Sequence, residues 1–199
     1  MSNQEGHLKG NSINSKKNNV SKTDTIGSMG TTGSAVSPML FLQVIDTEFE
    51  KYINPLLSLP LLTDNSSPLI QEVYILKDSF KIAISSEKIV KSGIFGFSAD
   101  IRDLSEDAAY YCPLAPYSIS LFINGENLSN ISFESMKVSD GEMNLQVLDG
   151  ILYNDLYKSE YEFFLGTFEL SPGDVMIEIS VKDFAGNEGV KIFPLKVVE

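Results

Sequence analysis

The chain contains few residues of the types that usually perform metal-dependent or nucleophilic chemistry. Its 199 residues include one histidine (His7), one cysteine (Cys112) and no tryptophan. A single cysteine cannot form an intrachain disulfide, and one histidine with one cysteine cannot supply a zinc site built mainly from these types. A Ser-His-Asp triad would have to use His7, which lies in a polar stretch near the first residue. We therefore expect no metal site, no cofactor and no hydrolytic activity.

Other sequence patterns could bind a ligand, but each has a plainer interpretation. Asp183-Phe-Ala-Gly-Asn187 could hold calcium in a loop, yet it does not match the spacing of an EF-hand, and a tight turn is the favoured interpretation. Gly27, Gly30 and Gly33 lack the Gly-Lys-Ser/Thr ending of a phosphate-binding loop, so we interpret them as turn formers. A set of aromatic side chains could stack on sugars, although their alternating placement favours the core for most of them. These aromatic residues are Tyr110, Tyr111, Tyr153, Tyr157, Tyr161, Phe163 and Phe164.

The charge of the chain argues against two classes of partner. Fifteen Lys and Arg against 27 Asp and Glu give a net charge of −12, and residues 1–25 are slightly basic while the remainder is strongly acidic. An acidic surface repels phosphate backbones and anionic lipids, so we expect no nucleic-acid partner. No apolar run approaches the ~20 residues that a membrane helix needs, and residues 1–25 contain no apolar core of a signal peptide. We therefore expect no membrane insertion.

The chain divides into zones of different composition. Residues 1–35 are rich in small polar residues, 36–62 are apolar with Pro55 and Pro60, and 63–68 are linker formers. From residue 69 onward, short apolar runs alternate with turn residues, which predicts strands. A further strand is predicted over Met39–Ile45. The strands predicted after the linker are Leu69–Leu76, Phe80–Ser86, Ile94–Ile101, Tyr117–Asn124, Asn130–Phe133, Met143–Leu148, Tyr161–Leu170, Val175–Lys182 and Val190–Val198.

Alternation and turn chemistry define the predicted fold class. Apolar residues recur at every second position in Tyr117–Ile123 and Ile177–Lys182, which is typical of antiparallel strands with one solvated face. Asn124-Gly125 predicts a hairpin turn because both residues tolerate positive φ. Ser171–Asp174 predicts another turn, and Asp183–Asn187 separates the last two strands. The chain is therefore predicted to be all-β, with an immunoglobulin-like antiparallel β-sandwich over 69–199.

Short motifs between residues 6 and 60 resemble those of a known family. They are Gly6-His7-Leu8, Ser12-Ile13, Val20–Gly27, Gly30-Thr-Thr-Gly33-Ser34, Ser37-Pro38-Met39-Leu40-Phe41 and Tyr52-Ile53-Asn54-Pro55. In this order they resemble the second half of a lysostaphin-type (LytM-like) zinc peptidase domain, which cleaves peptidoglycan. The remainder is similar to the β-sandwich appended to some bacterial members. The resemblance implies a truncated, peptidase-like β segment over 1–62, a linker over 63–68 and a sandwich over 69–199.

The same resemblance implies that the zinc site is lost. The family holds zinc with a His-x-x-x-Asp pair, for which this sequence has no counterpart, and with the second histidine of His-Leu-His. That triplet aligns with Met39-Leu40-Phe41. The Phe41 ring has no lone pair to donate, and the Met39 thioether cannot transfer protons at neutral pH. His7 is the one residue that matches a functional residue of the family, so we expect a pseudoenzyme.

The preferred hypothesis is a non-catalytic relative of the peptidoglycan endopeptidases that binds the cell envelope or regulates another wall hydrolase. Its partners would be peptidoglycan or that hydrolase. One alternative is a fragment of a zinc metallopeptidase acting on peptidoglycan cross-links, and another is a stand-alone β-sandwich adhesion or glycan-binding module. The resemblance implies that the protein is located in the cell envelope or periplasm, whereas a location in the cytoplasm follows if Met1 is the true start.

Half a peptidase sheet would leave unpaired strand edges around Leu40–Ile45. We therefore expect this segment to dock on the sandwich, to pair with a partner, or to cause self-association.

Overall fold

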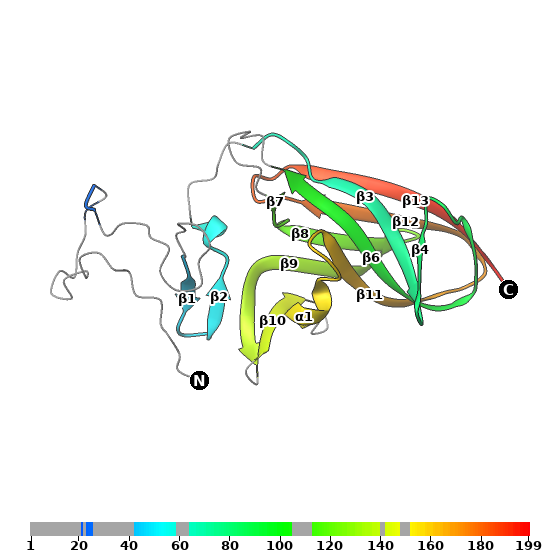
Figure 1. The fold of residues 1–199 in the computed structure, drawn as a ribbon, viewed down its shortest axis with the longest axis horizontal. Coiled ribbons are helices and arrows are strands. Elements are labelled where there is room, and N and C mark those ends of the chain that lie inside the picture. Colours follow the sequence, from blue (N-terminus) through cyan, green and yellow to red (C-terminus); the bar gives the residue numbers. More distant parts are fainter. Residues whose placement is uncertain are drawn as a thin grey trace. The chain divides into compact units, whose positions relative to one another are not determined.

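The computed structural model of the protein describes residues 21, 23–25, 42–58, 64–104, 113–139, 142–147 and 152–199 (Figure 1). The chain divides into two units, Met1–Leu42 and Gln43–Glu199. In the first unit the described residues form a turn, in which the Asp24 amide donates to the Ser21 carbonyl at 3.0 Å. Among the described residues, no helix is long and apolar enough to cross a membrane.

Two β-sheets build the unit Gln43–Glu199, which confirms the all-β prediction. Along the larger sheet, neighbouring strands are β1 (Val44–Asp46), β2 (Lys51–Ile53), β9 (Glu126–Ser139), β8 (Ser118–Ile123), β12 (Gly173–Lys182), β13 (Glu188–Val198) and β5 (Ile89–Lys91), while β10 (Glu142–Val147) also pairs with β9. The smaller sheet runs β11 (Glu162–Leu170), β6 (Gly93–Leu104), β3 (Leu69–Lys77) and β4 (Phe80–Ala83), with β7 (Pro113–Leu114) on β6. The described pairings are antiparallel except β13 with β5. Short helical turns are η1 (Pro55–Leu57) and α1 (Tyr153–Leu156).

The inner faces of the two sheets share one hydrophobic core. Along β12, alternate residues from Val175 to Val181 are buried, as a strand with one solvated face requires. The smaller sheet contributes Ile75 and Phe97, both without exposed surface. Phe133 of β9 and Phe163 of β11 meet edge to face, with ring centroids 5.7 Å apart. The sheets therefore pack face to face as a sandwich (Figure 1).

Most of the strands predicted beyond residue 69 are present, but several ends differ. The strand predicted over Phe80–Ser86 ends at Ala83, because the Ser86 and Glu87 amides both donate to the Ala83 carbonyl and close a turn. The strand predicted over Asn130–Phe133 is far longer and extends across Glu126–Ser139. Its first half pairs with β8 and its second half with β10 and β2, so successive parts of one strand have different neighbours.

The three predicted turns connect different kinds of strand pairs. Asn124 and Gly125 have φ values of 51° and 83° and join β8 to β9, which confirms the hairpin. Asp183–Asn187 joins β12 to β13 and is also a hairpin connection. Ser171–Asp174 instead leads from β11 in the smaller sheet to β12 in the larger one. Turns of similar composition therefore form hairpins in two cases and a connection between the two sheets in the third.

The segment before the predicted linker extends the larger sheet. Strand β1 pairs with β2, and β2 pairs with β9. The Asn54 amide donates to the Glu134 carbonyl at 2.8 Å, and Asn54 Nδ2 donates to the Phe133 carbonyl at 3.0 Å. Val44 and Ile45 of the predicted Leu40–Ile45 segment thus lie in a hairpin that pairs with the sandwich through β2, whereas residues 40–41 lie outside the described part of the chain. The division between units falls at Leu42, upstream of the linker predicted over 63–68.

Candidate metal-binding site

The residues at the zinc-ligand and catalytic positions of the peptidase resemblance lie outside the described part of the chain. These are His7, Met39 and Phe41, and the same holds for Gly27, Gly30, Gly33 and Cys112. The loss of the zinc ligands therefore stays a prediction from sequence. Within the described residues, chemistry-bearing side chains gather at one end of the sandwich instead.

Three carboxylates from distant parts of the sequence meet at that end. Asp64 lies just before β3, Asp103 lies near the end of β6, and Asp183 follows β12. One oxygen from each lies within 4.8 Å of the others. Asp103 is only 2% exposed, Asp183 is also buried, and Asp64 is half-buried. Carboxylates are rarely buried without a partner, so this cluster requires an explanation.

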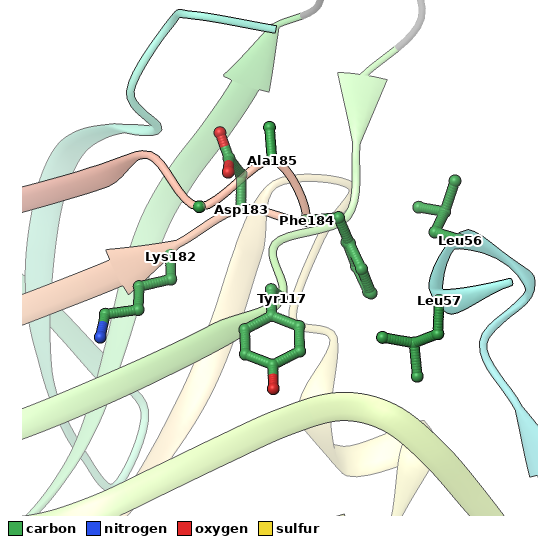
Figure 2. Close-up of a pocket in the computed structure, with 8 residues that line it drawn as sticks. Leu56, Leu57, Tyr117, Lys182, Asp183, Phe184 and Ala185 are labelled. Atoms are coloured by element: carbon green, nitrogen blue, oxygen red, sulfur yellow. The ribbon is translucent and has the colours of Figure 1, made fainter. Parts of the chain in front are cut away.

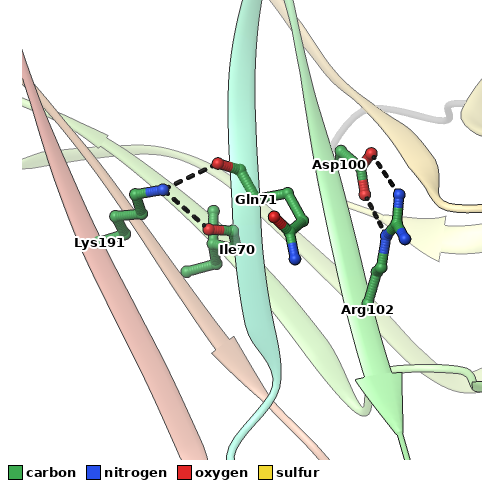
Figure 3. A network of polar contacts seen from close by, with 5 residues as sticks. All are labelled: Ile70, Gln71, Asp100, Arg102 and Lys191. Carbon is green, nitrogen blue, oxygen red and sulfur yellow. Dashed lines mark hydrogen bonds and ion pairs between the residues drawn. The ribbon is translucent and has the colours of Figure 1, made fainter. Parts of the chain in front are cut away.

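The start of β13 holds the segment that carries Asp64. Asn187 Nδ2 donates to the Asp64 carbonyl at 3.0 Å. Gly189 lies so close to Pro68 that an added Cβ would stand 2.1 Å from the Pro68 carbonyl oxygen. Lys191 Nζ then donates to the carbonyls of Ile70 at 3.1 Å and Gln71 at 2.8 Å (Figure 3). Residues 187, 189 and 191 alternate along the chain and so present one side to this segment.

The hydrogen bonds of the three carboxylates differ. Asp183 accepts from the Asn187 amide at 2.8 Å and from Asn187 Nδ2 at 2.7 Å, which is the bonding of a closed turn. Asp64 Oδ1 accepts from the Ser66 amide at 3.0 Å. Asp103 Oδ1 is buried and has no hydrogen-bond partner in the described structure. Local turn geometry therefore explains Asp183 but leaves Asp103 without a reason to be buried.

The electrostatics of the cluster are unfavourable to three negative charges. Burial, reinforced by the nearby charges of Asp183 and Asp64, raises the pKa of Asp103 from 3.8 to about 7. The ion pairs found between described residues, Lys81–Glu162 and Arg102–Asp100, involve none of the three. Figure 3 shows the Arg102 guanidinium engaged by Asp100. None of these ion pairs between described residues thus neutralises a carboxylate of the cluster.

A cavity of about 40 Å³ lies against the three carboxylates. It is completed by Leu56, Leu114, Ala115, Phe184 and Ala185. Its size suits a cation with a water molecule, since one water occupies about 30 Å³ of liquid. An all-oxygen set of ligands is what hard divalent cations prefer. The arrangement can therefore hold such a cation, whereas it contains no nucleophile with an adjacent base.

A larger pocket of about 390 Å³ adjoins the cluster and shares Asp183 with it. Tyr117 and Phe184 meet edge to face in its wall, with centroids 5.3 Å apart, and the Tyr117 hydroxyl donates to Glu134. Figure 2 shows the Phe184 ring directed toward Leu56 and Leu57, while the Asp183 carboxylate points away from that ring. The Asp183–Gly186 turn thus faces a carboxylate cavity on one side and an aromatic pocket on the other.

Of the aromatic residues singled out in the sequence, Phe163 and Tyr157 belong to or pack against the core, while Tyr161 and Phe164 are half-buried. Phe163 is buried, which confirms the core interpretation there. Tyr157 packs between Phe163 and Tyr153, with centroid distances of 5.2 and 5.1 Å, and burial raises the pKa of Tyr157 to about 12. Tyr153 is 40% exposed, and Tyr110 and Tyr111 lie outside the described residues. No continuous exposed aromatic face is seen among those that are described.

Sequence reasoning found one member of the carboxylate cluster and missed two. Asp183 was visible because it belongs to the Asp-Phe-Ala-Gly-Asn turn, which the structure confirms as a tight connection. Asp64 lies in a segment that reads as a linker, and Asp103 follows an apolar strand without a local motif. Only the pairing of β3 with β6 and the closeness of β13 to Pro68 bring them to Asp183.

The comparison with known proteins finds a family match that covers the sandwich. A protein-family model matches residues 67–198, which span β3 to β13 and exclude β1 and β2. No curated protein matches the chain.

Proposed function

We propose that the protein is a non-catalytic binding protein of the cell envelope. The chain belongs to the family whose model matches residues 67–198. It would be a relative of the peptidoglycan endopeptidases that binds peptidoglycan or regulates another wall hydrolase. The observation that carries this proposal is in the sequence: Met39 and Phe41 stand where the lysostaphin-type pattern has histidines. Neither side chain can hold zinc in place of imidazole.

The pocket beside Phe184 is the surface that we assign to this binding. Its walls combine apolar side chains with the rings of Tyr117 and Phe184, and Lys182 also lines it. Peptidoglycan offers apolar sugar faces to aromatic rings and carboxylates to a cation. The acidic remainder of the chain favours neither nucleic acid nor anionic lipid. A pocket of this composition is therefore suited to a wall fragment.

Co-sedimentation with insoluble peptidoglycan tests the proposal. The full chain is expected to sediment with the wall and to release no soluble fragments, with or without added zinc. Phe184→Ala and Tyr117→Ala should weaken sedimentation, whereas Phe80→Ala should not, because Phe80 is 72% exposed on β4 in the other sheet. Melting curves of all variants establish that they are folded. Zinc-dependent release of wall fragments, or no sedimentation of the folded chain, would contradict the proposal.

A stand-alone β-sandwich adhesion or glycan-binding module is the second candidate. The family match favours it, because that match begins at residue 67 and leaves out the segment with the peptidase resemblance. The double variant Met39→Ala/Phe41→Ala separates the two candidates. A wall-hydrolase relative would use its N-terminal segment for binding in addition to the pocket beside Phe184, so the double variant should sediment less. Unchanged sedimentation would favour the stand-alone module.

A further inference from the structure

We propose that Asp64, Asp103 and Asp183 form a binding site for one calcium ion at the end of the sandwich. The proposal goes beyond the wall-binding function and does not depend on it. It also departs from the sequence-based expectation of no metal site, in which a tight turn was the favoured interpretation of Asp183–Asn187 and calcium binding the alternative. The geometry of the cluster and one buried, unpartnered oxygen both point to a bound cation.

The separation of the oxygens fits a shared ion. Calcium binds oxygen at about 2.3–2.6 Å, so two ligands of one ion lie at most about 5 Å apart. The candidate ligand atoms all lie within 4.8 Å of one another. The adjoining cavity of about 40 Å³ provides space for the ion and a water ligand. Distances and space are thus both compatible with a single cation.

The buried oxygen of Asp103 is the second, independent observation. Asp103, which contributes an oxygen to the cluster, is 2% exposed, and its Oδ1 has no hydrogen-bond partner in the described structure. Leaving a buried charged acceptor unsatisfied is costly, and turn geometry gives no compensation at this residue. A cation bound between the carboxylates would satisfy that oxygen and offset the repulsion among the three charges.

The chemistry of the ligands selects the ion. Three carboxylates without described histidine or cysteine at the cluster favour a hard cation over zinc or copper. Calcium tolerates irregular coordination and completes its shell with waters and carbonyl oxygens. Magnesium demands a near-octahedral shell and gives up its waters reluctantly. A site whose ligands come from three separate segments therefore fits calcium better.

Calorimetric titration of the full chain with calcium chloride, after removal of metal and in moderate salt to screen the acidic surface, tests the site. One calcium per chain is expected, with a rise in melting temperature on saturation and at least tenfold weaker binding of magnesium. Asp103→Asn and Asp64→Asn should each weaken calcium binding at least tenfold. Asp174→Asn is the matched control, because Asp174 is exposed on β12 away from the cluster and should bind as the unmodified chain does.

Folding of the variants is monitored by melting in chelator. Removing one of three repelling charges should leave the metal-free melting temperature of Asp103→Asn unchanged or higher, so loss of binding there is not loss of fold. Absence of a calcium-dependent heat and melting shift in the unmodified chain would overturn the proposal. Equal binding by Asp103→Asn, Asp64→Asn and Asp174→Asn would overturn it too, because the ion would then lie elsewhere on the acidic surface. Wall sedimentation is a separate measurement, so either proposal can fail alone.

Discussion

At the scale of single residues, Asp103 links stability to pH. Its pKa is raised from 3.8 to about 7 by burial and by the neighbouring charges of Asp183 and Asp64. The folded state therefore holds the proton more tightly than the unfolded chain. The resulting stabilisation is complete below pH 3.8 and is lost as the pH rises to about 7. At about 1.4 kcal/mol per pKa unit, the loss amounts to at most roughly 4 kcal/mol.

Urea unfolding in chelator measures this effect. Because other groups also titrate, the informative quantity is the difference between the unmodified chain and Asp103→Asn at each pH. Asp103→Asn should gain in relative stability between pH 4 and pH 7.5, since asparagine stays neutral. Parallel pH dependences of the two proteins would show that Asp103 does not titrate in this range.

Gly189 is a second residue whose identity follows from its surroundings. An added Cβ would stand 2.1 Å from the Pro68 carbonyl oxygen, which is a backbone atom and cannot move aside as a flexible side chain could. Gly189→Ala must therefore push β13 away from the segment before β3, at a cost of roughly 1–3 kcal/mol. The free energy of unfolding from urea titration checks this expectation. Val190→Ala is the control, because Val190 is exposed and should change stability by at most about 0.5 kcal/mol.

At the scale of elements, the β1–β2 hairpin depends on a small number of contacts. It pairs with β9 over three residues, and Asn54 adds a side-chain hydrogen bond to the Phe133 carbonyl. Asn54 Oδ1 also accepts from the Leu56 amide and caps η1. Both bonds belong to one side chain, so its loss should loosen the hairpin without unfolding the sandwich.

Asn54→Ala tests that separation. Amide exchange across Lys51–Ile53 should become faster, by a factor corresponding to about 1 kcal/mol per lost hydrogen bond. Exchange in β12 and β13 should not change, because these strands lie further along the larger sheet. Asn127→Ala, an exposed position on β9, should leave both regions as they are. Faster exchange throughout the sandwich would mean that the hairpin and the core unfold together.

The sequence predicted those elements whose signals are local. Alternation along β12 and the Asn124-Gly125 turn both follow from a few adjacent residues, and both are present. Strand β5 was missed because three residues carry no period, and its pairing with β13 is parallel and distant in sequence. The length of β9 was underestimated because each half pairs with different strands. The carboxylate cluster was missed for a similar reason, because only contacts between segments distant in sequence bring Asp64 and Asp103 close to Asp183.

At the scale of the whole molecule, the candidate calcium site ties together three segments that the chain order separates. Asp64 lies before the first strand of the smaller sheet, Asp103 near the end of β6 in that sheet, and Asp183 in the hairpin of the larger sheet. An ion bound by all three would couple the two sheets at one end of the sandwich. In its absence, like charges at that end would favour local opening.

Hydrogen exchange with and without calcium tests the coupling. Calcium should slow amide exchange over 64–68, around residue 103 and over 183–187 together, and to a similar extent, because each segment would have to release the same ion to open. Strand β4, which contributes no ligand, serves as the internal control and should not respond. Asp103→Asn should abolish the protection in all three segments at once. Protection confined to 183–187 would show instead that calcium binds the turn alone, so that the two sheets are not coupled through the ion.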